Sequence, residues 1–453
     1  MTIEQALQGA KCIHFVGVGG SGIFPIVQIL HGRGFKIQGS DNNPGDITST
    51  EQAMGIKVMS GHSSQNIDGA DVVIYSAAIM KDNPELLAAR DSGIPVFRRC
   101  EALGYLTKLY ENSICVGGTH GKTTTTAILT HMLVGAGYDP GAVIGGKLPS
   151  IGGYGRAGSS DIMTCESCEF TDTFLHLFPA ISVVLNIGED HLDYFGSLEN
   201  IISSFSRFMS LASKFVIINE GDENSHKAAE GILKPKITFG FSSNSDYYPE
   251  NIKAPSPSSW IFDLMHKGRY LVTLNLNVPG RHNILNALAA CSAALQVGMK
   301  PEELAATIPS FTGAGRRFEI IGQTRGITIA DDYAHHPTEI RATLETAMQM
   351  GYKTVWAVFQ PFTYSRTSFL LDGFAESLAM ADRVVMSEIM GGREHNTFSI
   401  HTKDLSEKIP GSEWFSSFEE IANHVMSRAQ SGDLVITLGC GDIYKCAKMM
   451  LLK

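Results

Sequence analysis

Residues 117–124 combine glycines, one lysine and three threonines in a pattern typical of a phosphate-binding loop. They follow an apolar run at 113–116 and precede an apolar, helix-like segment at 127–133. In a strand–loop–helix unit, glycines let backbone N–H groups turn toward phosphate oxygens, and the helix N-terminus adds partial positive charge. The residues expected to bind a nucleotide are Gly118, Thr119, His120, Gly121, Lys122, Thr123 and Thr124.

Two side chains of this loop have specific chemical roles. Lys122 would reach the β- and γ-phosphates, and the Thr123 hydroxyl would bind Mg²⁺. The strict pattern has a glycine where this chain has Val116, so the loop matches a shorter variant, G-T-H-G-K-T. The alternative is a Gly-Lys turn without a ligand, but both flanks favour nucleotide binding.

A second glycine-rich loop, G-V-G-G-S-G at 17–22, directly follows the strand-like residues 12–16. Asp41 follows the next strand, at the distance where a Rossmann acid meets a ribose hydroxyl. Such a loop predicts that a diphosphate approaches a helix N-terminus, without saying which nucleotide carries it. NAD, a sugar nucleotide and a tight turn without ligand all stay open.

Acidic and imidazole side chains follow two further strand-like runs, at 165–169 and 186–194. Carboxyl ends of parallel strands are where open α/β sheets bind ligands. Glu166 can provide one carboxylate to Mg²⁺ beside Thr123, and His191 is acceptable at a second Mg²⁺ or a Mn²⁺. For Asp190 and Asp193, capping of a helix is an equally good interpretation.

The last third of the chain has two polar clusters. Residues 331–340 contain the pair His335-His336 after a strand-like run, without zinc spacing, so polar contacts to a ligand are favoured over a metal. Arg366, in 360–367, could bind a carboxylate through two parallel hydrogen bonds, although a single surface arginine is usually only solvated.

Composition narrows the class of protein. The chain has 453 residues and a formal net charge of −10, without a basic stripe, so nucleic-acid binding gains no support. No apolar run reaches membrane-spanning length, and the N-terminus does not resemble a signal peptide, so membrane insertion is not expected. Eight scattered cysteines are typical of reduced thiols, and we expect a cytoplasmic protein.

Short strand-like runs alternate with helix-like segments along most of the chain, which predicts an α/β protein with mostly parallel sheets. At roughly 150 residues for each domain, the length suggests about three domains. Turn-rich or glycine-rich segments near residues 110–112 and 311–315 give boundaries that divide the chain into 1–111, 112–312 and 313–453.

Four segments in this order resemble the Mur ligases, a family of ATP-dependent amino-acid ligases. They are G-T-H-G-K-T at 118–123, D-H-L-D-Y at 190–194, P-G-R-H-N-I-L-N-A at 279–287 and G-R-R-F-E at 315–319. The resemblance covers essentially the whole chain. It implies a Rossmann-like N-terminal domain, a central P-loop ATPase domain with a mostly parallel sheet, and a Rossmann-like C-terminal domain.

Within the family, the chain is most similar to the branch that joins L-alanine to UDP-N-acetylmuramate through an acyl phosphate. The cofactors this implies are ATP and Mg²⁺, with Mn²⁺ as a substitute, and the expected protein is a monomer or homodimer. The residues implied for the UDP-sugar are Gly17, Gly19, Gly20, Gly22, Asp41 and Ser76. Those implied for ATP include His282 and Asn286 near adenine, with Arg317 and Asp332 from the C-terminal domain. His336 and Arg366 would lie near the amino acid, and His191 or His336 would be the base.

The chain departs from the family pattern at three places. Other branches carry a carbamylated lysine where this chain has Phe205, which favours the L-alanine branch. The usual histidine of Q-P-H is Phe362, and 166–169 is a variant of the commoner E-A-D-E. The branch that attaches an intact tripeptide stays as an alternative. A nicotinamide-dependent dehydrogenase would leave the lysine loop unexplained, and a third alternative is an ATP-binding protein without catalysis.

Overall fold

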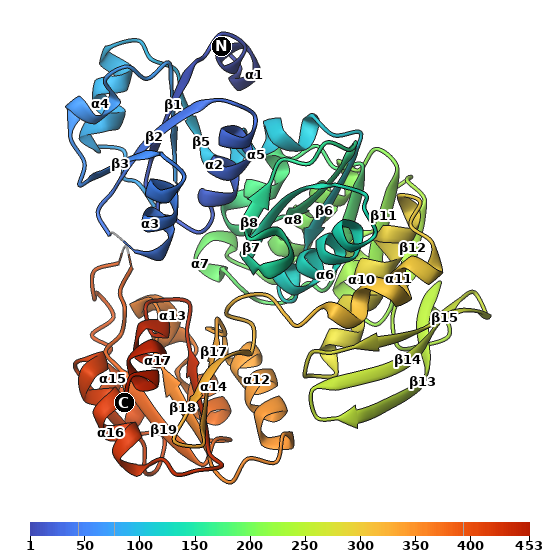
Figure 1. Cartoon of the computed structure of the whole chain (residues 1–453), viewed down its shortest axis with the longest axis vertical. Coiled ribbons are helices and arrows are strands. Elements are labelled where there is room, and N and C mark those ends of the chain that lie inside the picture. The colour runs from blue at the N-terminus through green and yellow to red at the C-terminus, as the bar shows by residue number, and fades with distance from the viewer. Residues whose placement is uncertain (44, 77, 393) are drawn as a thin grey trace. The chain divides into compact units, whose positions relative to one another are not determined.

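The computed structural model describes residues 1–43, 45–76, 78–392 and 394–453, and it contains three β-sheets with helices around them (Figure 1). Two compact units divide the chain. The first comprises residues 1–252, 261–276 and 284–311, and the second comprises 253–260, 277–283 and 312–453. The first unit contains the two sheets whose strands lead into the glycine loops. The second unit contains the sheet with the strands that end shortly before His336 and Arg366.

The first sheet is fully parallel and has the strand order β3-β2-β1-β4-β5. Its strands are β1 (Cys12–Val16), β2 (Lys36–Asp41), β3 (Lys57–Ser60), β4 (Val72–Tyr75) and β5 (Val96–Arg98). The order reverses between β1 and β4. Ligands of open parallel sheets bind outside the carboxyl ends of the strands at such a switch point, which is where the first glycine loop begins.

Alternation of side chains along β1 explains why helices cover both faces of this sheet (Figure 1). Ile13 and Phe15 belong to a core with α2, whereas Val16 joins Leu86 and Ala89 of α4 in another. The helical segments of this part are α1 (Ile3–Leu7), α2 (Phe24–Gly32), α3 (Asp46–Ala53), η1 (Ser64–Ile67), α4 (Pro84–Asp91) and α5 (Arg99–Lys108).

The second sheet has ten strands, in the order β15-β14-β13-β12-β11-β10-β6-β9-β7-β8. The strands are β6 (Asn112–Gly117), β7 (Gly141–Leu148), β8 (Gly153–Arg156), β9 (Ile162–Glu166), β10 (Ile181–Val184), β11 (Phe215–Asn219), β12 (Lys236–Phe239), β13 (Tyr247–Ser256), β14 (Ser259–His266) and β15 (Arg269–Leu276). β6 is parallel to both of its neighbours, β9 and β10. The loops after these three strands therefore meet at one edge.

Helices surround this second sheet and complete the first unit. They are α6 (Lys122–Gly135), η2 (Pro149–Ile151), η3 (Phe170–His176), α7 (Leu192–Phe195), α8 (Leu198–Ser210), α9 (Glu223–Ala228), α10 (His282–Gln296), α11 (Pro301–Thr307) and η4 (Ile308–Ser310). Gln28 of α2 accepts hydrogen bonds from Tyr154 and Gly155 of the edge strand β8, at 3.1 and 3.0 Å. The edge strand is thus covered by a helix of the preceding sheet, and one apolar core continues through both.

The third sheet has the order β16-β17-β21-β18-β19-β20 and is parallel apart from β16. Its strands are β16 (Glu319–Thr324), β17 (Ile327–Asp332), β18 (Val355–Phe359), β19 (Arg383–Ser387), β20 (Glu413–Phe415) and β21 (Leu434–Leu438). Its helices are α12 (Pro337–Gln349), α13 (Tyr364–Phe369), α14 (Leu371–Leu378), α15 (Thr402–Ser406), α16 (Phe418–Arg428) and α17 (Tyr444–Leu451). Ala357 packs with α12 and α14, and Val358 packs with α16 and α17, so both faces are covered.

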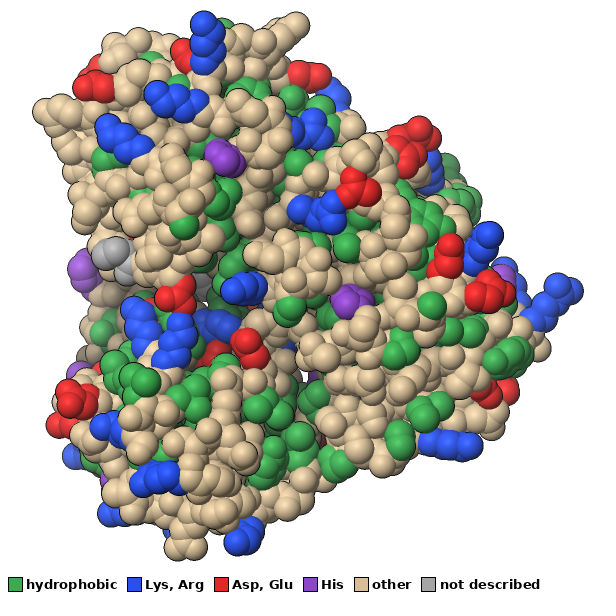
Figure 2. Space-filling view, in the orientation of Figure 1, with side chains coloured by type: hydrophobic (Ala, Val, Ile, Leu, Met, Phe, Trp, Pro, Cys, Tyr) green, Lys and Arg blue, Asp and Glu red, His purple; other side chains and the backbone are tan. Residues whose placement is uncertain are grey.

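The structure confirms the α/β class with mostly parallel sheets, and each strand-like run named from the sequence lies in a strand. The boundaries 1–111, 112–312 and 313–453 stay predictions. Within the described ranges, no helix combines the length and apolarity needed to cross a membrane. Acidic and basic side chains both occur across the face in Figure 2.

Candidate active site

The lysine loop leaves β6 and enters α6 through two glycines with positive φ, Gly118 at 143° and Gly121 at 87°. A side chain at Gly121 would also collide with Asn286, because a Cβ there would lie 2.5 Å from its Oδ1. The neighbouring strand end secures the loop, since Asn186 accepts hydrogen bonds from the N–H groups of Thr119 and His120 at 2.9 and 2.8 Å. The backbone of the loop is therefore held in one conformation before any ligand binds.

Lys122 points back into its own loop rather than into solvent. Its ammonium donates to the carbonyl oxygens of Gly118 and Thr119, the latter at 3.1 Å, and lies 3.1 and 3.0 Å from the two carboxylate oxygens of Glu169. Burial alone would lower the pKa of Lys122, but the charge of Glu169 outweighs it and raises that pKa above its ordinary value. Lys122 is therefore cationic at neutral pH, as charge neutralisation at a phosphoryl group requires.

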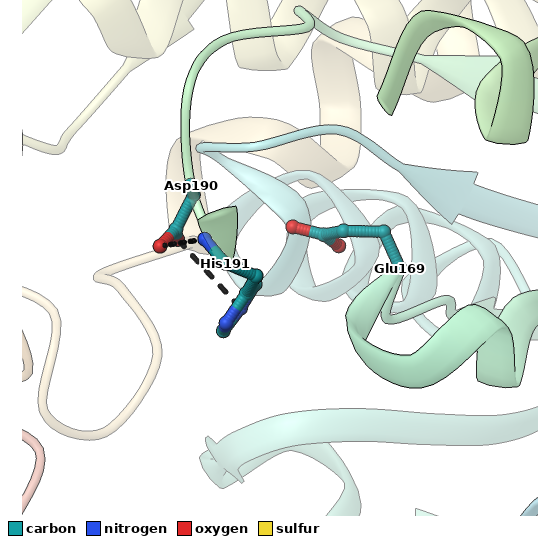
Figure 3. Close-up of side chains that lie close together, drawn as sticks. All are labelled: Glu169, Asp190 and His191. Atoms are coloured by element: carbon teal, nitrogen blue, oxygen red, sulfur yellow. Dashed lines mark hydrogen bonds and ion pairs between the residues drawn. The ribbon is translucent and has the colours of Figure 1, made fainter. Parts of the chain in front are cut away.

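A candidate metal site lies beside this lysine, formed by Glu169, Asp190 and His191 (Figure 3). One ligand atom from each side chain lies within 4.8 Å of the other two. Glu169 precedes η3, whereas Asp190 and His191 come from the loop after β10, and the Glu169 carboxylate points toward the other two residues (Figure 3). Oε2 of Glu169 is buried and accepts no hydrogen bond, although it lies near the ammonium of Lys122.

The sequence interpretation singled out Glu166 and missed Glu169. Glu166 is the last residue of β9, and its Oε2 accepts a hydrogen bond of 2.7 Å from the N–H of Gly145 on the adjacent strand. Glu169 is three residues further along and is nearly inaccessible to solvent. Both glutamates belong to the motif at 166–169, so the sequence did mark Glu169 as a candidate ligand. Which of the two carboxylates faces the lysine loop depends on the fold. Glu166 as a metal ligand stays a prediction.

Backbone strain surrounds the same cluster. His191 has a φ of 52°, and Thr171 and Asp172 just after Glu169 have φ values of 53° and 56°. Left-handed conformations are costly for residues other than glycine and occur preferentially at functional sites. The Phe170 ring also contacts the His191 imidazole, with centroids 4.6 Å apart. These contacts fix where the imidazole lies relative to the carboxylates.

Two residues expected near the adenine lie on α10. Asn286 is buried beside the lysine loop and its Oδ1 accepts a hydrogen bond of 3.2 Å from Thr125. His282 is the first residue of the same helix. Thr123, the expected metal ligand of the loop, is buried in the first turn of α6, and Thr124 follows it with partial exposure. Their contacts with ATP stay predictions.

The N-terminal glycine loop is fixed to the end of β2. Gly17 and Val18 donate hydrogen bonds to the carbonyl oxygen of Ser40 at 2.8 and 3.0 Å. Asp41 accepts one of 2.9 Å from the N–H of Gly19. Asp41 therefore shapes the loop through its side chain, whereas its expected contact with a ribose hydroxyl stays a prediction.

Ser76 follows β4 and completes this edge of the first sheet. Its N–H donates to the carbonyl oxygen of Val16 at 3.2 Å, and a Cβ placed on Gly17 would contact its Cβ at 3.4 Å. The structure therefore brings Gly17, Asp41 and Ser76 together at the switch point of the sheet, where a diphosphate would approach. Gly20 and Gly22 lie in the same loop, which ends where α2 begins.

The C-terminal sheet places Asp332 at the end of β17. Its two oxygens accept hydrogen bonds of 2.7 Å from the N–H groups of Phe318 and Ala334. Burial raises the pKa of Asp332 to about 6, against the opposing effect of the Arg317 charge. Arg317 lies over the Tyr333 ring at 5.2 Å. Arg317 therefore lies within electrostatic reach of Asp332 at the carboxyl end of the sheet.

His336 and Arg366 follow neighbouring elements of this second unit. His336 is the N-cap of α12, and its Nδ1 lies 2.8 Å from Oγ1 of Thr338. Arg366 lies in α13, whose N-cap Thr363 has a φ of 62° and accepts a hydrogen bond from the Arg366 N–H. A threonine in this conformation is strained, which marks the turn as a functional candidate. The roles of both residues toward an amino acid stay predictions.

Comparisons with protein families match nearly all of these elements. The model of the Mur ligase family catalytic domain matches residues 12–111, the Mur ligase middle domain matches 116–294, and the Mur ligase glutamate ligase domain matches 316–441. The chain belongs to the Mur ligase family. The resemblance inferred from the four sequence segments is thereby confirmed.

Curated relatives extend over the full length. A protein of Agathobacter rectalis named UDP-N-acetylmuramate–L-alanine ligase is 43% identical over 448 residues, which are 97% of this chain and 98% of the relative. A protein of Clostridium acetobutylicum with the same name is 40% identical, with 98% of both chains covered.

Solved structures agree with the three-domain architecture. The UDP-N-acetylmuramate-alanine ligase MurC of Thermotoga maritima is 27% identical, superposes with a TM-score of 0.83 and covers 98% of both chains. A murein peptide ligase of Psychrobacter arcticus, 24% identical with a TM-score of 0.76 and 98% coverage of both chains, shows the same fold.

Proposed function

We propose that this member of the Mur ligase family joins L-alanine to the carboxylate of UDP-N-acetylmuramate, in peptidoglycan precursor synthesis, with conversion of ATP to ADP and phosphate. The observation that carries the proposal is the edge of the second sheet, where Lys122, Glu169, Asp190 and His191 converge from the ends of three adjacent parallel strands. Relatives with that named activity cover nearly the whole chain at 38–43% identity. Eight cysteines without a disulfide fit a reducing, cytoplasmic location.

The chemistry requires activation of a poor electrophile. A carboxylate reacts with an amine only after conversion to a better acylating group, and transfer of the γ-phosphoryl group to it gives an acyl phosphate. Lys122 would stabilise the charge on the phosphoryl oxygens, as such lysines do in phosphate loops. The backbone N–H groups of the loop and the first turn of α6 would bind the remaining phosphates.

The side chains at the candidate metal site fit a divalent cation. Two carboxylates and one imidazole gather within 4.8 Å, and the buried Oε2 of Glu169 accepts no hydrogen bond from the protein. Mg²⁺ prefers oxygen ligands, and Mn²⁺ accepts the imidazole more readily. When bound, the ion would neutralise charge on the transferring phosphoryl group. Thr123 would add a hydroxyl ligand from the loop.

The second half of the reaction needs a neutral amine. The chain offers His191 in the first unit and His336 in the second, and either imidazole could accept a proton near neutral pH. Arg366 would bind the carboxylate of L-alanine, and Arg317 with Asp332 would contact ATP. The glycine loop at 17–22, with Asp41 and Ser76, would hold the UDP part of the other substrate.

Phosphate release in the presence of ATP, Mg²⁺ and UDP-N-acetylmuramate tests this function. We expect release with L-alanine, weaker release with glycine or L-serine, and none with an intact tripeptide. Lys122→Ala should abolish release, whereas Lys147→Ala, an exposed lysine on β7, should not change it. Release that depends on the tripeptide rather than L-alanine would reassign the chain to another branch of the family.

A further inference from the structure

Residues 185–188 connect the end of β10 with the candidate metal site. In the sheet β10 lies between β6 and β11, so this segment lies between the loops that follow those two strands. On the side of β6, Asn186 accepts hydrogen bonds from the lysine loop, as described above, and the N–H of Gly188 donates to Oγ1 of Thr119 at 2.8 Å. The lysine loop and the metal ligands of the loop after β10 therefore depend on one connecting segment.

The loop after β11 contacts the same segment through three side chains. Asn219, the last residue of β11, donates from Nδ2 to the carbonyl oxygen of Leu185 at 3.0 Å. Oδ2 of Asp222 accepts a hydrogen bond of 3.1 Å from the N–H of Ile187, and Nδ2 of Asn224 donates to the Ile187 carbonyl oxygen at 2.9 Å. Asn219, Asp222 and Asn224, called the β11 clamp below, thus continue with side chains the pairing that β10 and β11 form with their backbones.

The β11 clamp is itself held in place by its own loop. Asp222 is the N-cap of α9, and its Oδ2 also accepts a hydrogen bond of 2.9 Å from the N–H of Ser225. Oδ1 of Asn219 accepts one of 3.0 Å from the N–H of Gly221. The rotamers of these two side chains are therefore fixed by short-range contacts, which lets them fix the neighbouring segment in turn.

The conformation of His191 shows why the segment needs such support. Its φ of 52° is left-handed, and a residue other than glycine keeps this conformation only where the surrounding structure over-determines it. The β11 clamp fixes the chain up to Ile187, and α7 begins directly after His191. The short stretch that contains Asp190 and His191 is therefore held at both of its ends.

We infer that Asn219, Asp222 and Asn224 are positioning residues for the candidate metal site. They fix the backbone before the Asp190 carboxylate and the imidazole that follows it, so that both stay opposite Glu169 (Figure 3). This inference rests on the proposed function, because it concerns the divalent cation of that reaction. The clamp acts through the backbone of residues 185–187 and takes no part in bond making.

Titration of the full-length protein with Mn²⁺ alone tests the inference, because the electron paramagnetic resonance signal of free Mn²⁺ measures binding without turnover. We expect the double variant Asn219→Ala/Asn224→Ala to bind Mn²⁺ about 10- to 100-fold more weakly than the parent, as for loss of groups that orient metal ligands. Its calorimetric affinity for UDP-N-acetylmuramate should be unchanged, since that substrate is assigned to the first sheet. The rate of phosphate release should approach that of the parent when Mn²⁺ is saturating.

Two variants of Asp222 separate the clamp from the helix cap. Asp222→Asn keeps an oxygen for the N–H of Ile187, so we expect its Mn²⁺ affinity to stay within about threefold of the parent, whereas Asp222→Ala should resemble the double variant. Ser417→Ala, which removes the N-cap side chain of α16 in the second unit, is the control for a loss of stability alone. It should retain the Mn²⁺ affinity of the parent.

Other results would overturn the inference. If the folded double variant binds Mn²⁺ within about threefold of the parent, the metal ligands keep their place without the clamp. Equal losses of affinity for Mn²⁺ and for UDP-N-acetylmuramate would indicate a disturbance of the whole first unit. A parent protein that binds no Mn²⁺ would leave no metal site to position.

If the double variant does not fold, Asn224→Ala decides in its place, with several-fold weaker Mn²⁺ binding expected and unchanged binding as the contrary result. Failure of the proposed function is separate, since the parent protein would then bind Mn²⁺ without releasing phosphate in the presence of L-alanine.

Discussion

Glu166 and Glu169 are three residues apart, yet their carboxylates have different partners. Glu166 accepts a backbone hydrogen bond on the neighbouring strand, whereas Glu169 lies between the Lys122 ammonium and the imidazole of His191. We expect Glu169→Gln to lower the rate of phosphate release about 10²- to 10³-fold, comparable to loss of an electrostatic stabiliser. It should also raise the Mg²⁺ concentration needed for half-maximal rate.

Glu166→Gln is the matched comparison for this prediction. The amide keeps an oxygen for the Gly145 N–H, so we expect the rate and its Mg²⁺ dependence to change by less than about tenfold. Titration of Mg²⁺ and of Mn²⁺ into both variants measures the difference. If Glu166→Gln raises the required Mg²⁺ concentration more than Glu169→Gln does, Glu166 is the metal ligand, as the sequence pattern predicted.

Glu51 carries a carboxylate that is fully buried and accepts no hydrogen bond. Burial, with a smaller contribution from the nearby charge of Asp41, raises the pKa of Glu51 to about 8. Glu51 loses its proton in the unfolded state above a pKa of about 4.3, whereas the folded state keeps this proton up to a pH of about 8. Stability should fall as the pH rises through this window, by a total on the order of a few kcal/mol.

Glu51→Gln removes this titration and keeps the shape of the side chain. We expect the free energy of unfolding of the variant to decline less than that of the parent between pH 5 and pH 8.5. Urea unfolding at several pH values measures both curves. Parallel curves would show that Glu51 is charged in the folded protein, with a counterion or water that compensates it.

At the residue scale, the sequence could predict a candidate site where all its residues are contiguous in the chain. The lysine loop needs only a strand, two glycines and a helix, and these are contiguous in the chain. Glu169 and Asp190 follow β9 and β10, which are separated in the sheet by β6, so no spacing rule relates them. His336 has the additional role of capping α12 through its ring nitrogen, which depends on the rotamer rather than on the residue type.

At the scale of the elements, alternation of apolar strands with helices predicted the parallel sheets, because strands buried on both faces are apolar throughout. The order of the strands was not predictable, since it depends on which crossover packs against which face. Residues 242–259 are rich in serine, asparagine and proline, a composition typical of loop or edge structure. The structure forms β13 and β14 from much of this segment, beside β15 at one end of the sheet.

A buried polar network links elements of the first sheet to its glycine loop. The Glu85 carboxylate, at the start of α4, accepts hydrogen bonds from Ser40 and Asn66 at 2.6 Å and lies 2.9 Å from Nε2 of His14. Burial would raise the pKa of Glu85, but hydrogen bonds from these three residues outweigh it and lower that pKa to about 2. The carbonyl group of the same Ser40 accepts from the first two residues of the loop. Glu85 is therefore placed to position the loop through Ser40.

We expect Glu85→Gln to lower the free energy of unfolding by about 3–5 kcal/mol, because the amide cannot replace a buried carboxylate with several donors. If Ser40 transmits the change, KM for UDP-N-acetylmuramate should rise while kcat and KM for ATP change little. Urea unfolding and steady-state kinetics measure these effects. Glu223→Gln, an exposed residue of α9, should change neither. A stability loss with unchanged KM would limit Glu85 to a structural role.

At the scale of the whole molecule, the two compact units separate the two halves of the proposed reaction. The first unit contains the lysine loop, the candidate metal site and the N-terminal glycine loop, to which we assign most of the phosphoryl transfer, although Arg317 and Asp332 of the second unit would also contact ATP. The second unit contains Asp332, His336 and Arg366. The sequence suggested three domains, 1–111, 112–312 and 313–453, whereas the shared core of the first two sheets emerged only from the structure.

This separation leads to a prediction about Arg366. If it binds the carboxylate of L-alanine, Arg366→Lys should reduce the rate with saturating ATP and UDP-sugar by one to three orders of magnitude, or about 1.5–4 kcal/mol, because an ammonium cannot reproduce two parallel hydrogen bonds. Formation of the acyl phosphate should be nearly unaffected, since it requires no amine. Trapping of the acyl phosphate with a reductant measures the first step, and release of the alanyl product measures the second. Arg341→Lys, on the exposed side of α12, is the control and should leave both steps intact. A variant that fails to form the acyl phosphate would instead assign Arg366 to phosphate binding, and the amino-acid pocket would have to lie elsewhere in the second unit.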